Sequence, residues 1–283
     1  MLEIKNVYKT FNAGTVNEKV ALKGLDLTLE DGDFVTVIGG NGAGKSTMLN
    51  AVAGVWPVDM GKIIIDGKDV TRLSEHQRAK YIGRVFQDPM MGTAATMQID
   101  ENLALAARRG LARTLKIGIT KKEHDEYYEL LKTLDLGLEN RMTSKVGLLS
   151  GGQRQAVTLL MATLKKPKLL LLDEHTAALD PKTAAKVLTL SEKIVEENHL
   201  TTLMITHNMK DAIKYGNRLI MMYEGHVSQM QGEQVAPQQT VDPLDELNEH
   251  SISSQCLDLA VFAQKQAVVL YYRRFGLFCK SGK

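Results

Sequence analysis

Residues 34–47, with the sequence FVTVIGGNGAGKST, decide the fold class of this chain. An apolar run ends in a glycine-rich turn, and a lysine and a serine then open a stretch with helical periodicity. The turn fits the pattern G-x-x-x-x-G-K-[ST], with Gly39, Gly44, Lys45 and Ser46 at the fixed places. Glycines let backbone N–H groups point at phosphates, and the following helix adds its positive N-terminal end. The stretch therefore predicts a nucleotide-binding loop between a buried strand and a helix over residues 45–55, although a chance match to the pattern is the alternative.

Further apolar runs rich in valine, isoleucine and leucine alternate with helical patterns, which indicates an α/β fold. We expect an open, mostly parallel sheet, and in such sheets the carboxyl ends of the strands form the ligand crevice. The residues expected at this edge are Gly40, Gln87, Asp173 and His207. The strand-like runs are residues 34–40, 61–70, 82–87, 168–174, 201–207 and 218–225.

The sequence pattern changes from strand-like to helical between Gln87 and Leu164. The segments IDENLALAARRGL and EHDEYYELLKTLDLG have helical periodicity with charged faces and no strand signal. We therefore predict a helical subdomain over about residues 88–164, inserted into a domain that spans residues 1–235. Residues 236–283 form a C-terminal tail of uncertain structure.

Composition narrows the class of protein. The formal net charge is only +2, from 35 basic and 33 acidic residues among 283, which gives no electrostatic reason to expect a nucleic-acid partner. Both cysteines, Cys256 and Cys279, lie near the C-terminus, a usage that suits a reducing cytosol. We find no signal-peptide pattern and no uncharged apolar run of the ~20 residues that cross a bilayer. We therefore expect a soluble protein whose membrane role, if any, comes through a partner.

The run LLLLDE, residues 169–174, supplies candidate catalytic groups. Asp173 ends an apolar run and is placed to hold Mg²⁺, and the next residue, Glu174, suits polarising an attacking water. An ordinary buried strand with an acidic turn is the alternative, which the phosphate loop makes the weaker one. His207 and Gln87 end two other strand-like runs at the same edge. His207 is expected to contact the terminal phosphate, and Gln87 the metal or the water.

The order of these motifs resembles the nucleotide-binding cassette of ABC transporters over residues 1 to about 235. The resemblance implies a phosphate-loop ATPase core with an N-terminal antiparallel β part, and it implies ATP and Mg²⁺ as ligands. Phe11 would stack on adenine, with Tyr8 as the second choice and core packing as the alternative for either. Metal contacts would come from Ser46, Gln87 and Asp173. The remaining loop positions expected to bind ATP are Asn41, Gly42, Ala43 and Thr47.

Residues 148–156, LLSGGQRQA, look like a second phosphate-binding element in a chain that already has one. The family resemblance explains this, because its cassettes pair head to tail and each ATP lies between two copies. Ser150, Gly151, Gly152 and Gln153 would then contact the ATP held by the phosphate loop of the partner copy. Closure of the pair would depend on ATP, and hydrolysis would reopen it.

The sequence departs from the family pattern at His175, where a proline is usual. A loop residue that shapes the turn is the favoured interpretation, and a metal ligand beside Asp173 and Glu174 is the weaker one. The segment from Leu259 onward has five basic residues, no acidic residue and many apolar ones. An amphipathic helix and an element outside the family architecture are equally compatible with it, and we assign it no function.

Together these features predict an ATP-hydrolysing subunit that powers a separate membrane permease from the cytoplasmic face of the membrane. An importer of a small solute, such as the aromatic amino acids tryptophan or tyrosine, is favoured. The expected partners are a second copy, the permease and an extracytoplasmic solute-binding protein, and no nucleic acid. A soluble ABC-type ATPase that acts on DNA or ribosomes is the main alternative. A regulator that binds ATP without hydrolysing it is disfavoured, because Glu174, Gln87 and His207 are all present.

Overall fold

We describe residues 1–111 and 118–230 of the chain from a computed structural model. The description below concerns residues 1–230, which form one compact unit. The tail predicted from residue 236 onward lies outside the described residues. Within the described ranges, no helix is both long and apolar enough to cross a bilayer.

The larger sheet has six strands in the order β10-β9-β3-β8-β7-β6, and all neighbours pair in parallel except β10, which runs antiparallel to β9. The predicted mostly parallel sheet is therefore confirmed. The strand β6 ends at Val85, so Gln87 lies two residues beyond the paired region. The strands are β3 (Phe34–Gly39), β6 (Ile82–Val85), β7 (Leu169–Asp173), β8 (Thr202–Ile205), β9 (Arg218–Tyr223) and β10 (His226–Met230).

The smaller sheet is antiparallel and has the order β2-β1-β4-β5, which confirms the expected N-terminal antiparallel part. Its strands are β1 (Leu2–Phe11), β2 (Lys19–Leu29), β4 (Met60–Ile65) and β5 (Lys68–Asp69). Between β4 and β5, Asp66 and Gly67 have φ values of 51° and 73°. Positive φ at both central residues is what a tight two-residue hairpin turn requires, and Asp-Gly is a favoured pair there.

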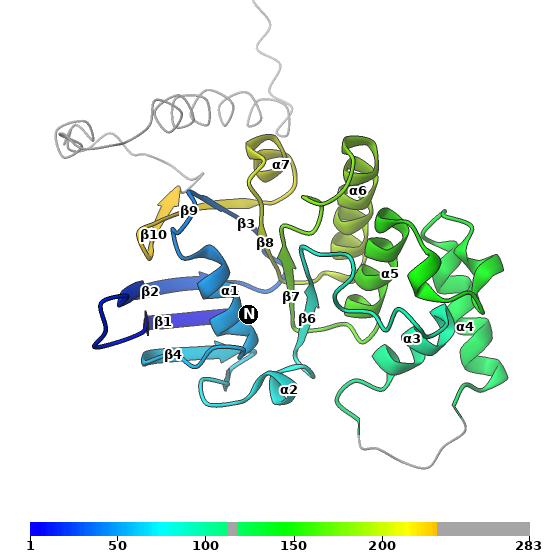
Figure 1. Cartoon of the computed structure of the whole chain (residues 1–283), viewed down its shortest axis with the longest axis horizontal. Helices are drawn as coiled ribbons and strands as arrows, with labels where there is room; N and C mark the ends of the chain where they lie inside the picture. Colours follow the sequence, from blue (N-terminus) through cyan, green and yellow to red (C-terminus); the bar gives the residue numbers. More distant parts are fainter. Residues whose placement is uncertain (112–117, 231–283) are drawn as a thin grey trace, which may run out of the picture. The chain divides into compact units, whose positions relative to one another are not determined.

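The helix α1 (Lys45–Ala53) lies between the two sheets, as Figure 1 shows. Its Met48, Leu49 and Val52 join a core cluster with residues of both sheets. The alternating side chains of β7 show why the parallel sheet is apolar throughout: Leu171 faces this cluster, and Leu170 faces a second cluster on the opposite side. That second cluster contains residues of α5 (Gly151–Thr163) and α6 (Pro181–Asn198), and α7 (Met209–Lys214) also contacts β3.

The C-terminal end of α1 is held by Arg78, which ends α2 (Glu75–Arg78) and is only 2% exposed. Its guanidinium donates to the carbonyl oxygens of Ala51 and Val52, and also to those of Leu73 and Thr71. A buried arginine is tolerated because backbone carbonyls accept its N–H groups. These bonds fix the helix that carries the phosphate loop at its other end.

The helical insertion between β6 and β7 has its own apolar core, which includes Leu103, Leu131 and Val157. Figure 1 shows its helices on the side of β6 that faces away from the antiparallel sheet. It consists of α3 (Ile99–Ala107), α4 (Lys121–Lys132) and two short 3₁₀ helices, η1 (Leu138–Arg141) and η2 (Val146–Leu148), and it ends in α5. The predicted insertion is therefore present, and α5 packs both on β6 and on α6.

Candidate functional site

The phosphate loop connects β3 to α1, and its lysine is held by the loop itself. The ammonium of Lys45 donates to the carbonyl oxygens of Gly39, at 2.8 Å, and Gly40, at 3.0 Å. Burial lowers the pKa of Lys45, and the nearby carboxylates of Glu174 and Asp173 oppose that effect. Gly44 precedes the helix with a φ of 100°, and a Cβ there would lie 2.7 Å from a backbone oxygen of β2. Only glycine fits this position.

The loop borders a cavity of about 140 Å³. Two residues from other strands reach it: His207 follows β8, which pairs with β3, and Glu174 follows β7, which pairs with β8. The residues around the cavity are Asn41, Gly42, Ala43, Gly44, Lys45, Ser46, Thr47, Glu174 and His207. The structure thus brings together most of the predicted loop with two of the three predicted catalytic side chains.

Glu174 and His207 form a close pair at this cavity. The Nε2 atom of His207 lies 2.6 Å from Oε1 of Glu174, and the Glu174 side chain is about one-tenth exposed. The backbone of Glu174 is left-handed, with a φ of 46°, and its N–H donates to the carbonyl of Ile205 on β8. A left-handed conformation is uncommon for a residue other than glycine, and such conformations cluster at active sites. The carboxylate is therefore held in one place beside the phosphate loop.

Asp173 has a partner that the sequence did not indicate. Arg84 of β6 places its Nη2 atom 3.2 Å from Oδ2 of Asp173, and both side chains are largely buried. The same nitrogen donates to Oδ1 of Asn50 on α1 at 2.9 Å. A lone arginine in the strand-like run IGRVF carries no spacing signal, so only the pairing of β6 with β7 reveals this contact.

The oxygen donors near the loop fit Mg²⁺. The Ser46 side chain borders the cavity, and the Asp173 carboxylate follows at the end of β7. Hydroxyl and carboxylate oxygens are hard ligands, and Mg²⁺ is usually bound by one or two carboxylates together with substrate phosphates.

Gln87 and Phe11 do not reach the cavity in this structure. Gln87 is exposed beyond the end of β6. The Phe11 ring packs edge-on against Trp56, with centroids 4.9 Å apart and an angle of 82° between the rings. The hydroxyl of Tyr8 lies against Gly24 of β2. The roles assigned to Gln87, Phe11 and Tyr8 therefore stay predictions.

The second glycine-rich element caps α5 and lies apart from the cavity. Ser150 and Gln153 bond each other reciprocally: the Gln153 N–H donates to Oγ of Ser150, and the Ser150 N–H donates to Oε1 of Gln153. Ser150 and Gly151 are exposed, whereas Gly152 is buried, and a Cβ there would lie 2.0 Å from Thr183 of α6. None of the four residues borders the 140 Å³ cavity. Within one chain the two glycine-rich elements are separate.

The side chain of His175 points into the protein interior. Its side chain is 1% exposed, and its Nε2 lies 3.0 Å from Oγ of Ser191 on α6. Because the Ser191 hydroxyl donates to the carbonyl of Val187, the imidazole is the donor to Ser191. Burial lowers the pKa of His175 from 6.5 to about 4. A neutral imidazole bonded to α6 supports the turn-shaping interpretation over the metal ligand.

This histidine predicts an acid-sensitive fold. Between pH 6.5 and pH 4 the unfolded chain binds a proton at His175 and the folded chain does not, so stability falls as the pH falls. From pH 7 to pH 5 we expect a loss of about 2 kcal/mol. Urea unfolding of the parent and of His175→Asn at both pH values measures it. The variant should lack this part of the loss, and equal losses in the two proteins would contradict the assignment.

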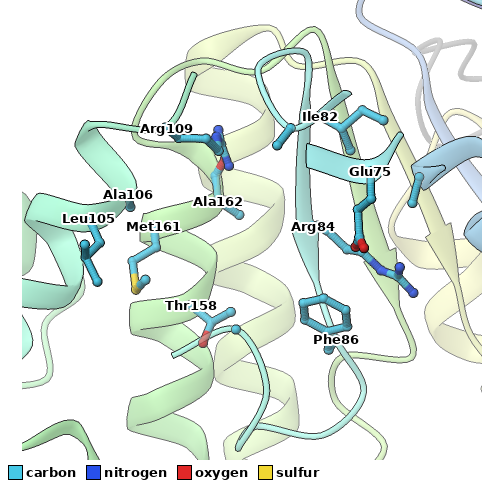
Figure 2. Close-up of a pocket in the computed structure, with 13 residues that line it drawn as sticks. Glu75, Ile82, Arg84, Phe86, Leu105, Ala106, Arg109, Thr158, Met161 and Ala162 are labelled. Atoms are coloured by element: carbon cyan, nitrogen blue, oxygen red, sulfur yellow. The ribbon is translucent and has the colours of Figure 1, made fainter. Parts of the chain in front are cut away.

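A second, larger cavity of about 360 Å³ lies between β6 and the helical insertion. Figure 2 shows Phe86, Leu105 and Met161 around it, with Arg109 at the opposite end from Phe86. Most of its lining is apolar, and Leu105 is 54% exposed. It shares no residue with the cavity at the phosphate loop, but Arg84 lines it and also contacts Asp173.

Comparison with known proteins agrees with this geometry. A family profile described as "ABC transporter" matches residues 22–177. A tyrosine transport ATP-binding protein from Clostridioides difficile is 46% identical over 227 residues, which cover 80% of this chain and 90% of the relative. A methionine import ATP-binding protein from Enterococcus faecalis is 36% identical over 230 residues, which cover 80% of this chain and 64% of the relative.

Solved structures extend the comparison to the fold. A dimeric ATP-binding cassette in a post-hydrolysis state, bound to ADP and Pi, superposes with a TM-score of 0.70 at 30% identity. The match covers 82% of this chain and all of the solved chain. A nucleotide-free cassette from an ABC transporter gives a TM-score of 0.65 at 27% identity, over 80% of this chain and 89% of the solved one. With its complete phosphate loop and its Glu174–His207 pair, the chain belongs to the ABC transporter family, as an ATP-binding cassette of the kind that hydrolyses ATP to power transport.

Proposed function

We propose that this protein is the ATPase subunit of an importer, that it drives a separate membrane permease, and that the solute is a small molecule such as an aromatic amino acid. The observation that carries the ATPase role is the single cavity that unites the phosphate loop with Glu174 and His207. The names of the two relatives, tyrosine transport and methionine import, support an amino acid as the solute.

Binding of ATP begins at the loop. Its backbone N–H groups and the N-terminal end of α1 would hold the phosphates, since both present positive partial charge. Lys45 would exchange the carbonyl oxygens of Gly39 and Gly40 for the β- and γ-phosphates. Ser46 and Asp173 would hold Mg²⁺, which neutralises phosphate charge, and Gln87 would approach from the end of β6. Phe11 would offer its ring to the adenine.

Hydrolysis needs a water aligned with the terminal phosphate. Glu174 is the general base of the proposal, because its carboxylate borders the cavity and is fixed by His207 and by its own backbone. His207 is about half exposed, so its ring contacts Glu174 and remains accessible to the γ-phosphate. Glu174 and His207 both border the cavity at the phosphate loop.

A second copy completes the site in this proposal. Ser150 and Gly151 are exposed at the N-terminal end of α5, where N–H groups and the helix dipole favour an anion. They would contact the γ-phosphate held by the partner's loop, and ATP would close the pair. Support comes from the dimeric form of the similar solved cassette. Gly152 has a structural reason of its own, the close packing on Thr183.

The permease would dock on the cavity between β6 and the helical insertion, from the cytoplasmic face of the membrane. We call this cavity, which is shown in Figure 2, the groove. The groove is mostly apolar, and Phe86 on its wall directly precedes Gln87, so a docked segment would lie next to a predicted site residue. An apolar groove with few polar groups suits a helix with an apolar face. An extracytoplasmic solute-binding protein would deliver the solute to the permease. The proposed domain remains residues 1–235, with the helical subdomain at about 88–164.

Co-purification from membranes tests this function. The tagged full chain is expressed in its native host and extracted with mild detergent. It should retain an integral membrane permease that can then be identified. Leu105→Glu should lower the yield of permease severalfold, because a charge replaces an apolar contact in the groove. Leu111→Glu is the matched control, since Leu111 is 60% exposed and does not line the groove. Recovery of DNA or ribosomes without a permease would favour the soluble alternative.

A further inference from the structure

Arg84 connects two elements that carry proposed metal ligands. It stands on β6, its side chain is only 12% exposed, and its guanidinium carbon lies 4.6 Å from the centroid of the Phe86 ring. One nitrogen, Nη2, donates both to Oδ2 of Asp173 and to Oδ1 of Asn50. The bond to Asp173 reaches β7 and the bond to Asn50 reaches α1, so a single atom spans the gap between strand and helix.

The position of Asn50 gives this contact its meaning. Asn50 follows Ser46 by four residues on α1, and residues four apart lie on the same face of a helix. The proposed metal ligands are thus Ser46 on one side of Arg84 and Asp173 on the other. The contact with Oδ2 also restricts the rotation of the Asp173 carboxylate, because the terminal torsion of an aspartate otherwise takes a wide range of angles. It leaves Oδ1 for a ligand.

Stability alone does not explain a cation at this place. The Nε atom of Arg84 is buried and, within the described part of the chain, has no hydrogen-bond partner. An unsatisfied buried donor costs free energy, and burying a charge costs more. Arg84 carries the cost of its unsatisfied Nε, and the partner of its charge is Asp173, a residue of the proposed nucleotide site.

We propose that Arg84 and Asn50 form a brace that sets the separation and orientation of Ser46 and Asp173 for Mg²⁺. Arg84 is a positioning residue in this role, since it acts through Asp173 and touches no substrate. The inference rests on the proposed function, which makes Ser46 and Asp173 the metal ligands. Partners that orient metal ligands in this way typically contribute about 10- to 100-fold to metal affinity.

Two effects of Arg84 on the metal oppose each other. As a positive charge it repels a cation, so its removal would tighten metal binding through electrostatics alone. As a brace it holds the ligands in place, so its removal would weaken metal binding. Asn50 separates the two effects, because Asn50→Ala breaks the brace without changing any charge.

The experiment measures binding of Mn²⁺, a spectroscopic substitute for Mg²⁺, by electron paramagnetic resonance in the presence of the β,γ-imido analogue of ATP. The variants of the full chain are Asn50→Ala, Arg84→Met and the double variant. Each single variant should bind Mn²⁺ about tenfold more weakly. The double variant should bind Mn²⁺ no more weakly than Arg84→Met does, because the same brace is lost in all three variants. Binding of the analogue in EDTA should stay within about twofold of the parent.

Arg109→Met is the matched control. Arg109 lines the same groove, but its guanidinium donates to the carbonyl of Ala162. Its Mn²⁺ affinity should equal that of the parent. Asn50→Ala with unchanged Mn²⁺ affinity would overturn the brace. If the parent itself fails to bind Mn²⁺ with the analogue, the proposed function fails instead, so the two failures are distinguishable.

Discussion

Glu174→Gln is expected to lower the rate constant of ATP hydrolysis by about 10²- to 10⁴-fold while ATP binding stays close to that of the parent. The amide keeps the size of the side chain and a contact with His207, which in the parent lies 2.6 Å from the carboxylate. It removes the oxygen that accepts a proton from the attacking water. Phosphate release under saturating ATP and equilibrium binding of ATP measure the two quantities separately.

Glu224→Gln is the control for this substitution. Glu224 also has a left-handed backbone, with a φ of 45°, but it is exposed in the turn between β9 and β10 and does not border the cavity. Its hydrolysis rate should equal that of the parent. Near-normal turnover in Glu174→Gln would mean that another group activates the water, and the general-base assignment would be wrong.

Lys45→Ala is expected to weaken ATP binding by about a hundredfold or more. The ammonium would make charge-assisted hydrogen bonds to two phosphates, each worth about 1.5–3 kcal/mol, and a factor of ten in affinity is about 1.4 kcal/mol. The loop is expected to survive, because its turn depends on glycine geometry at Gly44 and on the packing of α1.

Calorimetric titration with ATP measures the affinity of Lys45→Ala, and urea unfolding shows whether the variant is folded. Lys62→Ala serves as the control, because Lys62 is exposed on β4 and does not border the cavity. A folded Lys45→Ala protein that binds ATP as tightly as the parent would show that the loop is not the phosphate site.

The sequence predicted those site residues whose positions follow from the topology of the sheet alone. Glu174 and His207 follow β7 and β8, and these strands are parallel to β3 in the order β3-β8-β7, so both residues reach the phosphate loop. The apolar runs and the glycine pattern carry that information, because a parallel sheet aligns its strand ends. Gln87 shows the limit of this reasoning. It lies beyond the paired residues of β6, so strand pairing does not fix its position.

Other features depend on the direction of a single side chain. Nothing in the run IGRVF indicates that Arg84 reaches Asp173 and Asn50, because that contact requires the register of β6 on β7 and the placement of α1. The two interpretations of His175 also differed only in direction. The backbone at Glu174 is left-handed, and the next residue, His175, contacts Ser191. No sequence pattern predicts that turn.

The central claim is that the two glycine-rich elements serve two different ATP molecules across a dimer. Lys45→Ala removes the loop lysine, and Ser150→Arg blocks the exposed N-terminal end of α5 at the cost of a helix cap worth about 1 kcal/mol. Both variants are made in the Glu174→Gln background, so that bound ATP is preserved. In this account each variant alone would form a dimer in which both composite sites are defective.

In a mixed dimer the two lesions meet at one site, and the other site combines an intact loop with an intact α5 end. ATP retained on the dimer after rapid gel filtration is the measurement that tests the claim most directly. The composite site predicts one retained ATP per mixed dimer and almost none on either variant alone. Mixed dimers that form, as shown by two different affinity tags, and yet retain no more ATP than the separate variants would contradict it.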